Sequence, residues 1–319
     1  MSTLIWKPCP PSAGIRSHSQ LSAWNQWRYD RLVETEGGVS IVSIETHVAE
    51  HYTQGTLEQR ILTALREAGK DPDRLDPDDL APVDEFHHGG RSATAAFAPR
   101  LKLRPGIHLL EIGSGIGGPA RYFARYHGCR VTGIDLTEEF IVVSRALTRR
   151  LGIQGQISFE QGSALSMPFS AATFDVATLL HVGMNIAEKA RLFTEVRRVL
   201  KPGGIFGIYD QMREADGDLT FPVPWASVPQ TSFVETPATY KRLLTESGFE
   251  VIWERSCRED ALASFNQQTA AKPGSTALPP LGVQVTMGLS AAEKMANHRS
   301  NIERGLIAPN EIVARAPAP

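Results

Sequence analysis

Hydrophobic positions in the middle of the chain recur with the spacing of buried strands that alternate with helices. Ile107–Ile112 is an apolar run with the length of a buried strand, the glycines after it predict a tight turn, and Pro119 suits the first turn of a helix. Arg130–Asp135 predicts a second strand, and a helix to Leu151 follows it. This order predicts an α/β fold with a parallel sheet.

The same alternation continues toward the carboxyl terminus. We predict strands at Gln156–Glu160, from Thr173, at Ile205–Asp210, at Phe249–Cys257 and at Glu311–Arg315. A helix through Leu200 is expected to end at Lys201–Gly204, and a further helix is expected to begin at Thr236–Pro237 by N-cap and first-turn rules. We therefore assign residues 105–319 to one core, with a stiff, aromatic lid at 212–236 and an insertion at 258–309.

The amino-terminal third is predicted to be a helical cap. Apolar residues from Ile44 and from Leu57 fall on single stripes, which indicates two short amphipathic helices within residues 41–104. The proline-rich run that begins at Asp71 predicts turns rather than a long helix. Residues 1–40 are either a mobile tail or a helix that forms a lid or a subunit interface.

Composition narrows the class of partner. The 319 residues carry 33 lysines and arginines against 35 acids, so the net charge is −2 and gives no electrostatic footprint for nucleic acid. The three cysteines lie far apart without metal-type spacing, which favours a reducing compartment and no metal. The chain has no run of apolar residues long enough for a membrane span and no signal-peptide pattern near Met1. We expect a cytoplasmic enzyme with a small-molecule partner, and a homodimer is left open.

The glycine-rich loop is the main candidate for ligand binding. Gly113, Ser114, Gly115 and Gly117 follow the first predicted strand, where a ligand can lie against the backbone, and amide N–H groups and a helix N-terminus attract anionic oxygens. The same glycine spacing satisfies the dinucleotide-binding fingerprint, so the loop alone fits either a nicotinamide cofactor or another cofactor that contains adenosine. Glu111 favours an adenosine-bearing cofactor other than a nicotinamide one, because its carboxylate would repel a pyrophosphate but not an ammonium group.

Asp135 closes the second predicted strand about twenty residues farther on. The carboxyl ends of parallel strands face the ligand crevice, where a carboxylate can accept both hydroxyls of a ribose. The alternative is a helix cap, but Thr137 suits that position better. We therefore predict that Asp135 binds a ribose.

Several motifs, taken in order, resemble one known family. Glu-x-Gly-x-Gly-x-Gly from Glu111, Phe-Asp-Val from Phe174 and Leu-Lys-Pro-Gly-Gly from Leu200 resemble the core of class I S-adenosylmethionine-dependent methyltransferases. Phe-His-His-Gly-Gly from Phe86, His-Val-x-Met-Asn-Ile from His181 and 221–226 resemble the small-molecule branch, which includes sarcosine/dimethylglycine and ubiquinone/menaquinone-type enzymes.

The resemblance implies a Rossmann-like, seven-stranded sheet whose last strand is antiparallel and lies beside strand five. It also implies S-adenosylmethionine as cofactor. The cofactor-binding residues it implies are Glu111, Gly113, Ser114, Gly115, Gly117, Asp135, Leu136, Ser163, Ala164 and His181. Ser163 departs from the family, which commonly has an aspartate there for the adenine amino group, so adenine recognition would depend more on apolar walls.

Residues for the acceptor side are less defined by sequence. His181 is a candidate general base because it follows strand four, or else it anchors its loop. Substrate-binding candidates are His87 and His88 in a predicted loop, Tyr209 at the end of strand five, and Trp225 in the lid.

The expected reaction is in-line methyl transfer to a nitrogen, oxygen, sulfur or carbon atom of a small molecule. Positioning the acceptor can supply ~7–11 kcal/mol, whereas a general base contributes about 10²–10⁴-fold. The alternatives are a methyltransferase-like fold with a non-methylating or binding role, and a nicotinamide-dependent oxidoreductase.

Overall fold

The computed structural model describes residues 31–35, 38–42, 44–53, 55–271, 281–288 and 290–318. By its internal contacts the chain divides into two units, Met1–His51 and Tyr52–Pro319. In the first unit β1 (Arg31–Thr35) pairs antiparallel with β2 (Gly38–Val42), and α2 (Ile44–Tyr52) begins. We expected a tail or a helix here, but the alternating Val33, Val39 and Ile41 have the high strand propensity of β-branched residues. Residues 1–30 of that prediction lie outside the described residues.

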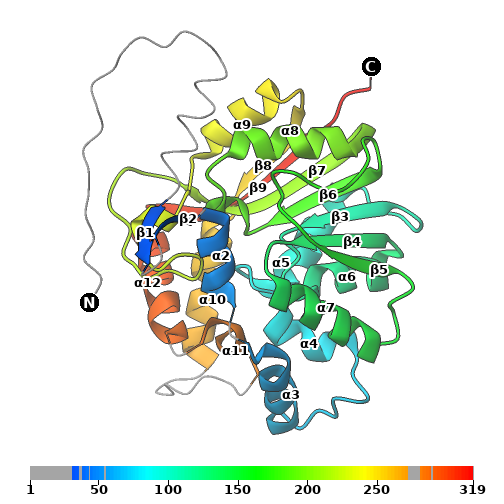
Figure 1. Ribbon diagram of the computed structural model, residues 1–319, viewed down its shortest axis with the longest axis vertical. Helices are drawn as coiled ribbons and strands as arrows, with labels where there is room; N and C mark the ends of the chain where they lie inside the picture. Colours follow the sequence, from blue (N-terminus) through cyan, green and yellow to red (C-terminus); the bar gives the residue numbers. More distant parts are fainter. Residues whose placement is uncertain are drawn as a thin grey trace. The chain divides into compact units, whose positions relative to one another are not determined.

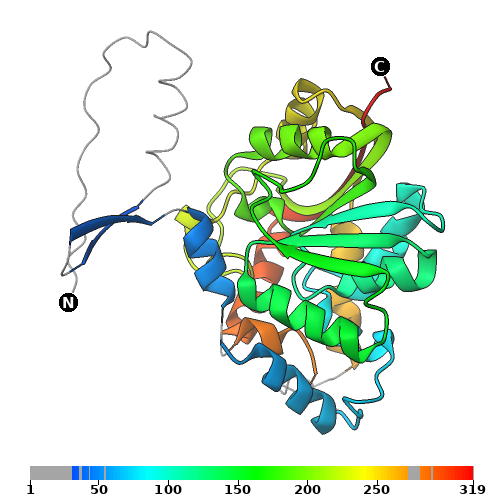
Figure 2. The same cartoon turned by 45° about the vertical axis from the view of Figure 1, so that its right-hand side comes forward.

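The second unit is built on a seven-stranded sheet with the order β5-β4-β3-β6-β7-β9-β8 (Figure 1, Figure 2). Its strands are β3 (His108–Ile112), β4 (Arg130–Asp135), β5 (Ile157–Gln161), β6 (Phe174–Leu180), β7 (Leu200–Arg213), β8 (Glu250–Ser256) and β9 (Ile307–Arg315). The last strand, β9, runs antiparallel between β7 and β8, and β3 to β7 are mutually parallel. The predicted Rossmann-like sheet is confirmed.

Helices cover both faces of this sheet. They are α3 (Leu57–Glu67), α4 (Pro77–Asp84), α5 (Gly90–Phe97), α6 (Gly118–His127), α7 (Glu138–Arg150), α8 (Lys189–Val199), α9 (Pro237–Glu246), α10 (Arg258–Ala271), α11 (Gln284–Met287) and α12 (Ala291–Glu303). Short 3₁₀ turns are η1 (Ala98–Leu101), η2 (Gly183–Asn185) and η3 (Pro229–Thr231). At α9 the Thr236 hydroxyl accepts from the Thr239 amide and Pro237 fills the first position, as the sequence predicts.

Alternation along the strands explains the two cores. Leu110 of β3 packs with Phe193 of α8 on the face that α9 also covers, whereas Leu109 packs with Phe97 and Phe123 of α5 and α6 on the other (Figure 1). Neighbouring residues of a strand point to opposite faces of the sheet. A strand that is buried on both faces therefore has a continuous run of apolar residues in its sequence. This layering leaves the carboxyl ends of β3, β4 and β6 for the loops that bear the motifs.

One local prediction needs correction, and the insertion contains helices of its own. Lys201–Gly204 belongs to β7, which starts at Leu200 and has a register shift there, so the helix already ends at Val199. In the insertion, 258–271 form α10 from good helix formers such as alanine and glutamine. Gly288, with φ +74°, separates α11 from α12.

The proline-rich stretch after Asp71 also contains a short helix. Asp76 forms a capping box with Asp79 at the start of α4, and Pro77 occupies its first turn. Among the residues that the model describes, no helix is both long and apolar enough to cross a membrane.

Candidate functional site

The glycine loop is fixed to β4 by its own backbone. The amides of Gly113 and Ser114 both donate to the Ile134 carbonyl, at 2.8 and 3.0 Å. The Gly115 amide donates to Oδ2 of Asp135 at 2.8 Å, and Gly117, at φ +87°, forms the N-cap of α6. The predicted strand, loop and helix unit is therefore present, with its amides close to the end of β4.

Close packing around the loop explains two of the glycines. A Cβ atom on Gly113 would lie 2.3 Å from a methyl of Val182, and one on Gly118 would lie 2.2 Å from the carbonyl oxygen of Asp84. Gly113 also has φ +68°, a conformation that side chains disfavour. The loop is thus closed in by the segment after β6 on one side and by the end of α4 on the other.

A buried group of charges lies behind the loop. Arg121, fully buried in α6, donates to Oδ2 of Asp84 at 2.8 Å and to the Ile116 carbonyl at 2.7 Å. Burial, followed by the charge of Glu85, raises the pKa of Glu111 well above its ordinary value. Oε2 of Glu111 and Oδ1 of Asp84 are buried and have no hydrogen-bond partner among the described residues. The sequence reading missed Asp84 and Arg121, although Asp84 lies two residues before Phe86 of a quoted motif.

Asp135 has two backbone partners in this structure. Its Oδ1 accepts from the Thr137 amide at 2.9 Å, while Oδ2 holds Gly115. Burial raises the pKa of Asp135, and these hydrogen bonds oppose that shift. Thr137 is the N-cap of α7, as predicted, and Asp135 orders the turn before it through the Thr137 amide. Binding of a ribose by Asp135 stays a prediction.

The remaining cofactor candidates lie at the same edge of the sheet. Leu136 and Ala164 are partly buried, as apolar walls would be, and Ala164 packs against the core on the α8 side. The Ser163 hydroxyl accepts from the Leu165 amide at 3.0 Å, and Oγ of Ser114 is buried without a partner among the described residues.

His181 has partners on both ring nitrogens. Nδ1 lies 3.1 Å from the Tyr209 carbonyl, which can only accept, so Nδ1 carries the proton. Nε2 then accepts from the Gln211 side-chain amide at 3.0 Å and from the His88 backbone amide at 3.3 Å. Burial, followed by the neighbouring histidines His87, His88 and His298, lowers its pKa well below the ordinary value. Gln211 and His298 carried no sequence signal.

His87 and Tyr209 have partners within the protein. The His87 ring lies 3.1 Å from the Gly90 carbonyl and 2.9 Å from the Thr94 hydroxyl, and burial lowers its pKa to about 4. The Tyr209 hydroxyl donates to the His88 carbonyl at 3.1 Å. Tyr209 therefore attaches the loop around His88 to β7, whereas His87 attaches it to α5.

The other two acceptor-side candidates, His88 and Trp225, lie in one aromatic group. Trp225 is buried and donates from Nε1 to the Ser232 hydroxyl at 2.9 Å. Both rings pack edge-on against His298 of α12. The 212–236 segment is thus packed on the 258–309 insertion through Trp225 and His298.

Tyr52 and Asn185 are further residues that the sequence reading missed at this site. The Asn185 amide donates to the Tyr52 hydroxyl at 3.0 Å. Burial first, and then the charge of Asp135, raises the pKa of Tyr52. Asn185 lies inside the quoted His181 motif, so that motif was the available signal.

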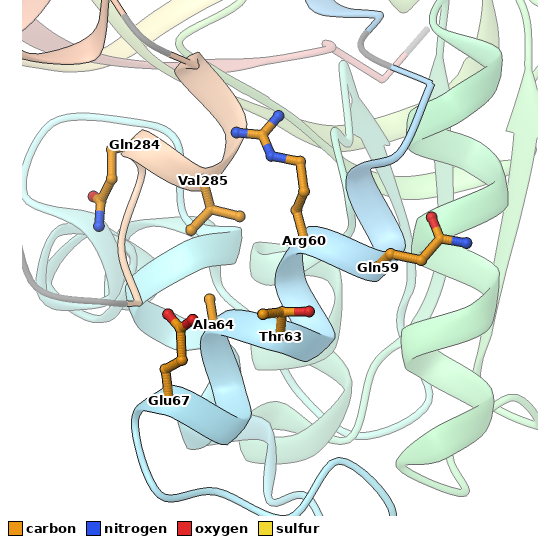
Figure 3. Close-up of a pocket in the computed structure, with 7 residues that line it drawn as sticks. All are labelled: Gln59, Arg60, Thr63, Ala64, Glu67, Gln284 and Val285. Carbon is orange, nitrogen blue, oxygen red and sulfur yellow. The ribbon is translucent and has the colours of Figure 1, made fainter.

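Two negative observations bound the chemistry. No group of histidine, cysteine and carboxylate side chains suited to hold a metal occurs in the described parts of the chain. An open pocket of about 400 Å³ lies between α3 and α11, away from the glycine loop (Figure 3). It is lined by Gln59, Arg60, Thr63, Ala64, Glu67, Gln284 and Val285, none of which was a predicted site residue.

Comparisons with known proteins agree with this geometry. Residues 110–208 match the family model described as "Methyltransferase domain". The sterol 24-C-methyltransferase of Eremothecium gossypii is 35% identical over 125 residues, which are 39% of this chain and 34% of that protein. The chain spans about a third of the length of the first curated relatives it matches.

Solved structures share the fold over most of the chain. The cyclase SpnF has a TM-score of 0.61 and 22% identity, with 87% of this chain and 98% of that chain covered. Geranyl diphosphate C-methyltransferase from Streptomyces coelicolor A3(2) has a TM-score of 0.63 and 16% identity, with 86% and 98% covered. At these identities the likeness shows the fold alone. The family match and the glycine loop within it identify residues 110–208 as a methyltransferase domain.

Proposed function

We propose that this protein uses S-adenosylmethionine to methylate a small molecule by in-line displacement. The observation that carries the proposal is the arrangement at the ends of β3 and β4. There the glycine loop is held by Asp135, and the buried Glu111 has an oxygen without a partner among the described residues. When bound, the cofactor supplies a methyl group on a sulfonium, which is already an activated leaving group.

The charges behind the loop fit this cofactor. The carboxyl groups of Asp84, Glu85 and Glu111 influence one another and are opposed by the guanidinium groups of Arg91 and Arg121. Burial raises the pKa of all three carboxyl groups, so a ligand that brings a positive charge favours their ionised forms, whereas a pyrophosphate would oppose ionisation. We propose that Glu111 faces the cationic part of the cofactor.

The ribose end of the site is proposed to use Asp135 in two ways. Its carboxylate already orients Gly115 and Thr137, and each oxygen retains a second lone pair that can accept from a hydroxyl. Leu136, Ser163 and Ala164, at the ends of the neighbouring strands, would line the adenine. Gly113, Ser114 and Gly117 keep the backbone close enough for contact.

Proton removal is not the main task of this site. His181 is neutral, and its Nε2 lone pair already accepts two hydrogen bonds, so we propose that His181 anchors the ends of β6 and β7 and the loop around His88. Holding the acceptor in line with the methyl group can supply ~7–11 kcal/mol without a base. We propose that the acceptor binds on this side of the loop, and the names of a relative and a fold neighbour, sterol 24-C-methyltransferase and geranyl diphosphate C-methyltransferase, support a small-molecule acceptor.

Two measurements on the folded protein test the proposal. Isothermal titration calorimetry should detect binding of S-adenosylhomocysteine and no binding of NAD or NADP. Mass spectrometry of reactions with candidate acceptors should then show a product heavier by one methyl group. Tight binding of NAD without binding of S-adenosylhomocysteine would replace the proposal with a nicotinamide-dependent oxidoreductase.

A second candidate is a reaction that keeps the cofactor site but transfers no methyl group. It is favoured by the hydrogen bonds at both His181 nitrogens and by the fold neighbour SpnF, which is a cyclase. The same mass measurement decides between the two, because a rearranged product has the mass of its substrate.

A further inference from the structure

Four rings from distant parts of the chain form one cluster, which we call the aromatic cluster: His88, Trp225, Phe265 and His298. They come from the loop before α5, the 212–236 segment, α10 and α12. The His88 ring centroid lies 5.0 Å from that of Phe265 and 5.8 Å from that of His298, and His298 lies 5.6 Å from Trp225. The geometries are edge-on, which aromatic rings prefer.

This cluster contains hydrogen-bonding atoms that nothing in the described chain uses. His298 is only 4% exposed, and both of its ring nitrogens lack a partner among the described residues. Nε2 of His88 also lacks a partner among the described residues. Beside the cluster, Gln211 is fully buried, and its Oε1 lacks a partner as well. An unpaired buried polar atom opposes folding, so a core built only for stability would replace it with a carbon.

The cluster lies next to the glycine loop. The His88 amide donates to Nε2 of His181 at 3.3 Å, and the Gln211 side chain binds the same nitrogen. The next residue, Val182, fills the space where a side chain of Gly113 would be. The segment 181–182 therefore touches the cluster on one side and the proposed cofactor loop on the other.

The electrostatic character of the cluster is neutral. Burial lowers the pKa of His298 to about 3 and that of His88 to about 4, and in both cases the neighbouring charge is another histidine rather than a carboxylate. Lys294 lies one turn before His298 on the buried face of α12, and Arg299 lies over Phe265 while paired with Glu303. One lysine and one already paired arginine do not amount to a diphosphate site.

We propose that the aromatic cluster recognises the methyl acceptor, an inference that rests on the proposed function. The acceptor is an apolar molecule with one uncharged hydroxyl group, and this hydroxyl group hydrogen-bonds to His298. The rings supply apolar walls, and the neutral imidazole offers one donor and one acceptor. An acceptor recognised by a diphosphate would need several cations or a metal. One recognised by an ammonium group would need a carboxylate or open ring faces, whereas these rings pack edge-on against one another.

Three probes with the same ten-carbon skeleton test the proposal. The full chain is first saturated with S-adenosylhomocysteine. It is then titrated separately with geraniol, geranyl diphosphate and the hydrocarbon myrcene. Geraniol should bind at least about tenfold more tightly than either of the others, because only geraniol offers a neutral hydroxyl to the imidazole. Tighter binding of geranyl diphosphate, or equal binding of geraniol and myrcene, would overturn the proposal.

Matched variants assign the effect to His298. His298→Phe should remove the preference of geraniol over myrcene, and His298→Gln, which keeps a donor and an acceptor, should restore part of it. His127→Phe is the control, because Nε2 of His127 also lacks a partner among the described residues, but this ring packs on Tyr122 and Phe123 of α6. A preference unchanged in His298→Phe contradicts the proposal.

The titration also separates the two levels of inference. If S-adenosylhomocysteine does not bind the wild-type chain, the proposed function fails. If it binds and geraniol shows no preference, the proposed function stands and the assignment of the aromatic cluster is wrong.

Discussion

The glycine-loop side of the site and the aromatic-cluster side bury polar groups in opposite ways. On the first side Arg121, Asp84 and Asp135 are bound to fixed partners that hold the loop in one shape. On the second side His88 and His298 are buried with ring nitrogens that no described residue satisfies. The comparison indicates that the protein itself sets the shape of the cofactor loop and leaves single oxygens of Glu111 and Asp84 without a partner, whereas on the aromatic-cluster side whole imidazole rings are left for a group that a ligand brings.

The largest expected effect comes from breaking the paired side. Arg121→Met leaves the carboxylate of Asp84 buried without its guanidinium, so the free energy of unfolding should fall by about 3–5 kcal/mol. Urea denaturation measures this loss. Adding Asp84→Leu removes the orphaned charge, so the double variant should regain most of the stability. A single variant as stable as wild type would contradict the description of this side as a paired network.

The next largest effect is expected from a change in the shape of the glycine loop. A glycine with the same backbone conformation elsewhere in the chain serves as the control. Gly113→Ala introduces the contact with Val182 at φ +68°, so the affinity for S-adenosylhomocysteine should fall about 100-fold, or ~2.7 kcal/mol. Gly152 has the same φ of +68° and no atoms within 4 Å of an added Cβ. Gly152→Ala should therefore cost stability through the backbone alone and leave the affinity unchanged. Calorimetry that shows equal affinity losses for both variants would contradict the assignment of the loop.

Acid should weaken the unpaired side selectively. The pKa of buried His298 is about 3, against an ordinary value of 6.5, so between those values the unfolded chain binds a proton that the native protein does not. The contribution of His298 to stability therefore falls as the pH drops below 6.5, by ~1.4 kcal/mol per pH unit. Between pH 6.5 and about pH 5, the free energy of unfolding of His298→Phe should therefore fall by ~2 kcal/mol less than that of the wild type. Parallel pH profiles of the unfolding free energy in the two proteins would show that His298 is not buried and neutral.

The smallest effect is expected at the end of β4. Asp135→Asn keeps the side-chain volume but replaces one charged acceptor of the Gly115 and Thr137 amides by an amide donor. Binding of S-adenosylhomocysteine should weaken about tenfold, or ~1.4 kcal/mol. Asp71→Asn is the matched control, because Asp71 also accepts from a backbone amide, that of Asp73, in an exposed turn. A loss of affinity in the control as large as in Asp135→Asn would remove Asp135 from the site.

The sequence predicted best what local pattern determines. Arg130–Asp135 is β4 with the same bounds, and Thr236–Pro237 begins α9, because strand periodicity and capping depend on neighbouring residues. The seven strands and the antiparallel last strand beside strand five, which are β9 and β7, followed from the family resemblance and are confirmed. The hairpin of β1 and β2 was missed because each strand is only five residues long, and α10 was missed because its apolar residues do not fall on one stripe.

Tertiary packing decided what the sequence could not give. Nothing in the spacing of His88 and His298 indicates that their rings lie 5.8 Å apart, because that distance depends on how α12 packs on the loop before α5. In the same way, Arg121 reads as a surface residue of an amphipathic helix until Asp84 is placed beside it. Residues 1–30 of the predicted tail or lid lie outside the described residues.

The central claim is that the loop after β3 accepts a zwitterionic adenosyl amino acid rather than a dinucleotide. Isothermal titration calorimetry of the intact protein with S-adenosylhomocysteine and with NAD tests it most directly. We predict saturable binding of S-adenosylhomocysteine at one site per chain and no heat of binding with NAD. Binding of NAD together with no detectable association of S-adenosylhomocysteine would contradict the account.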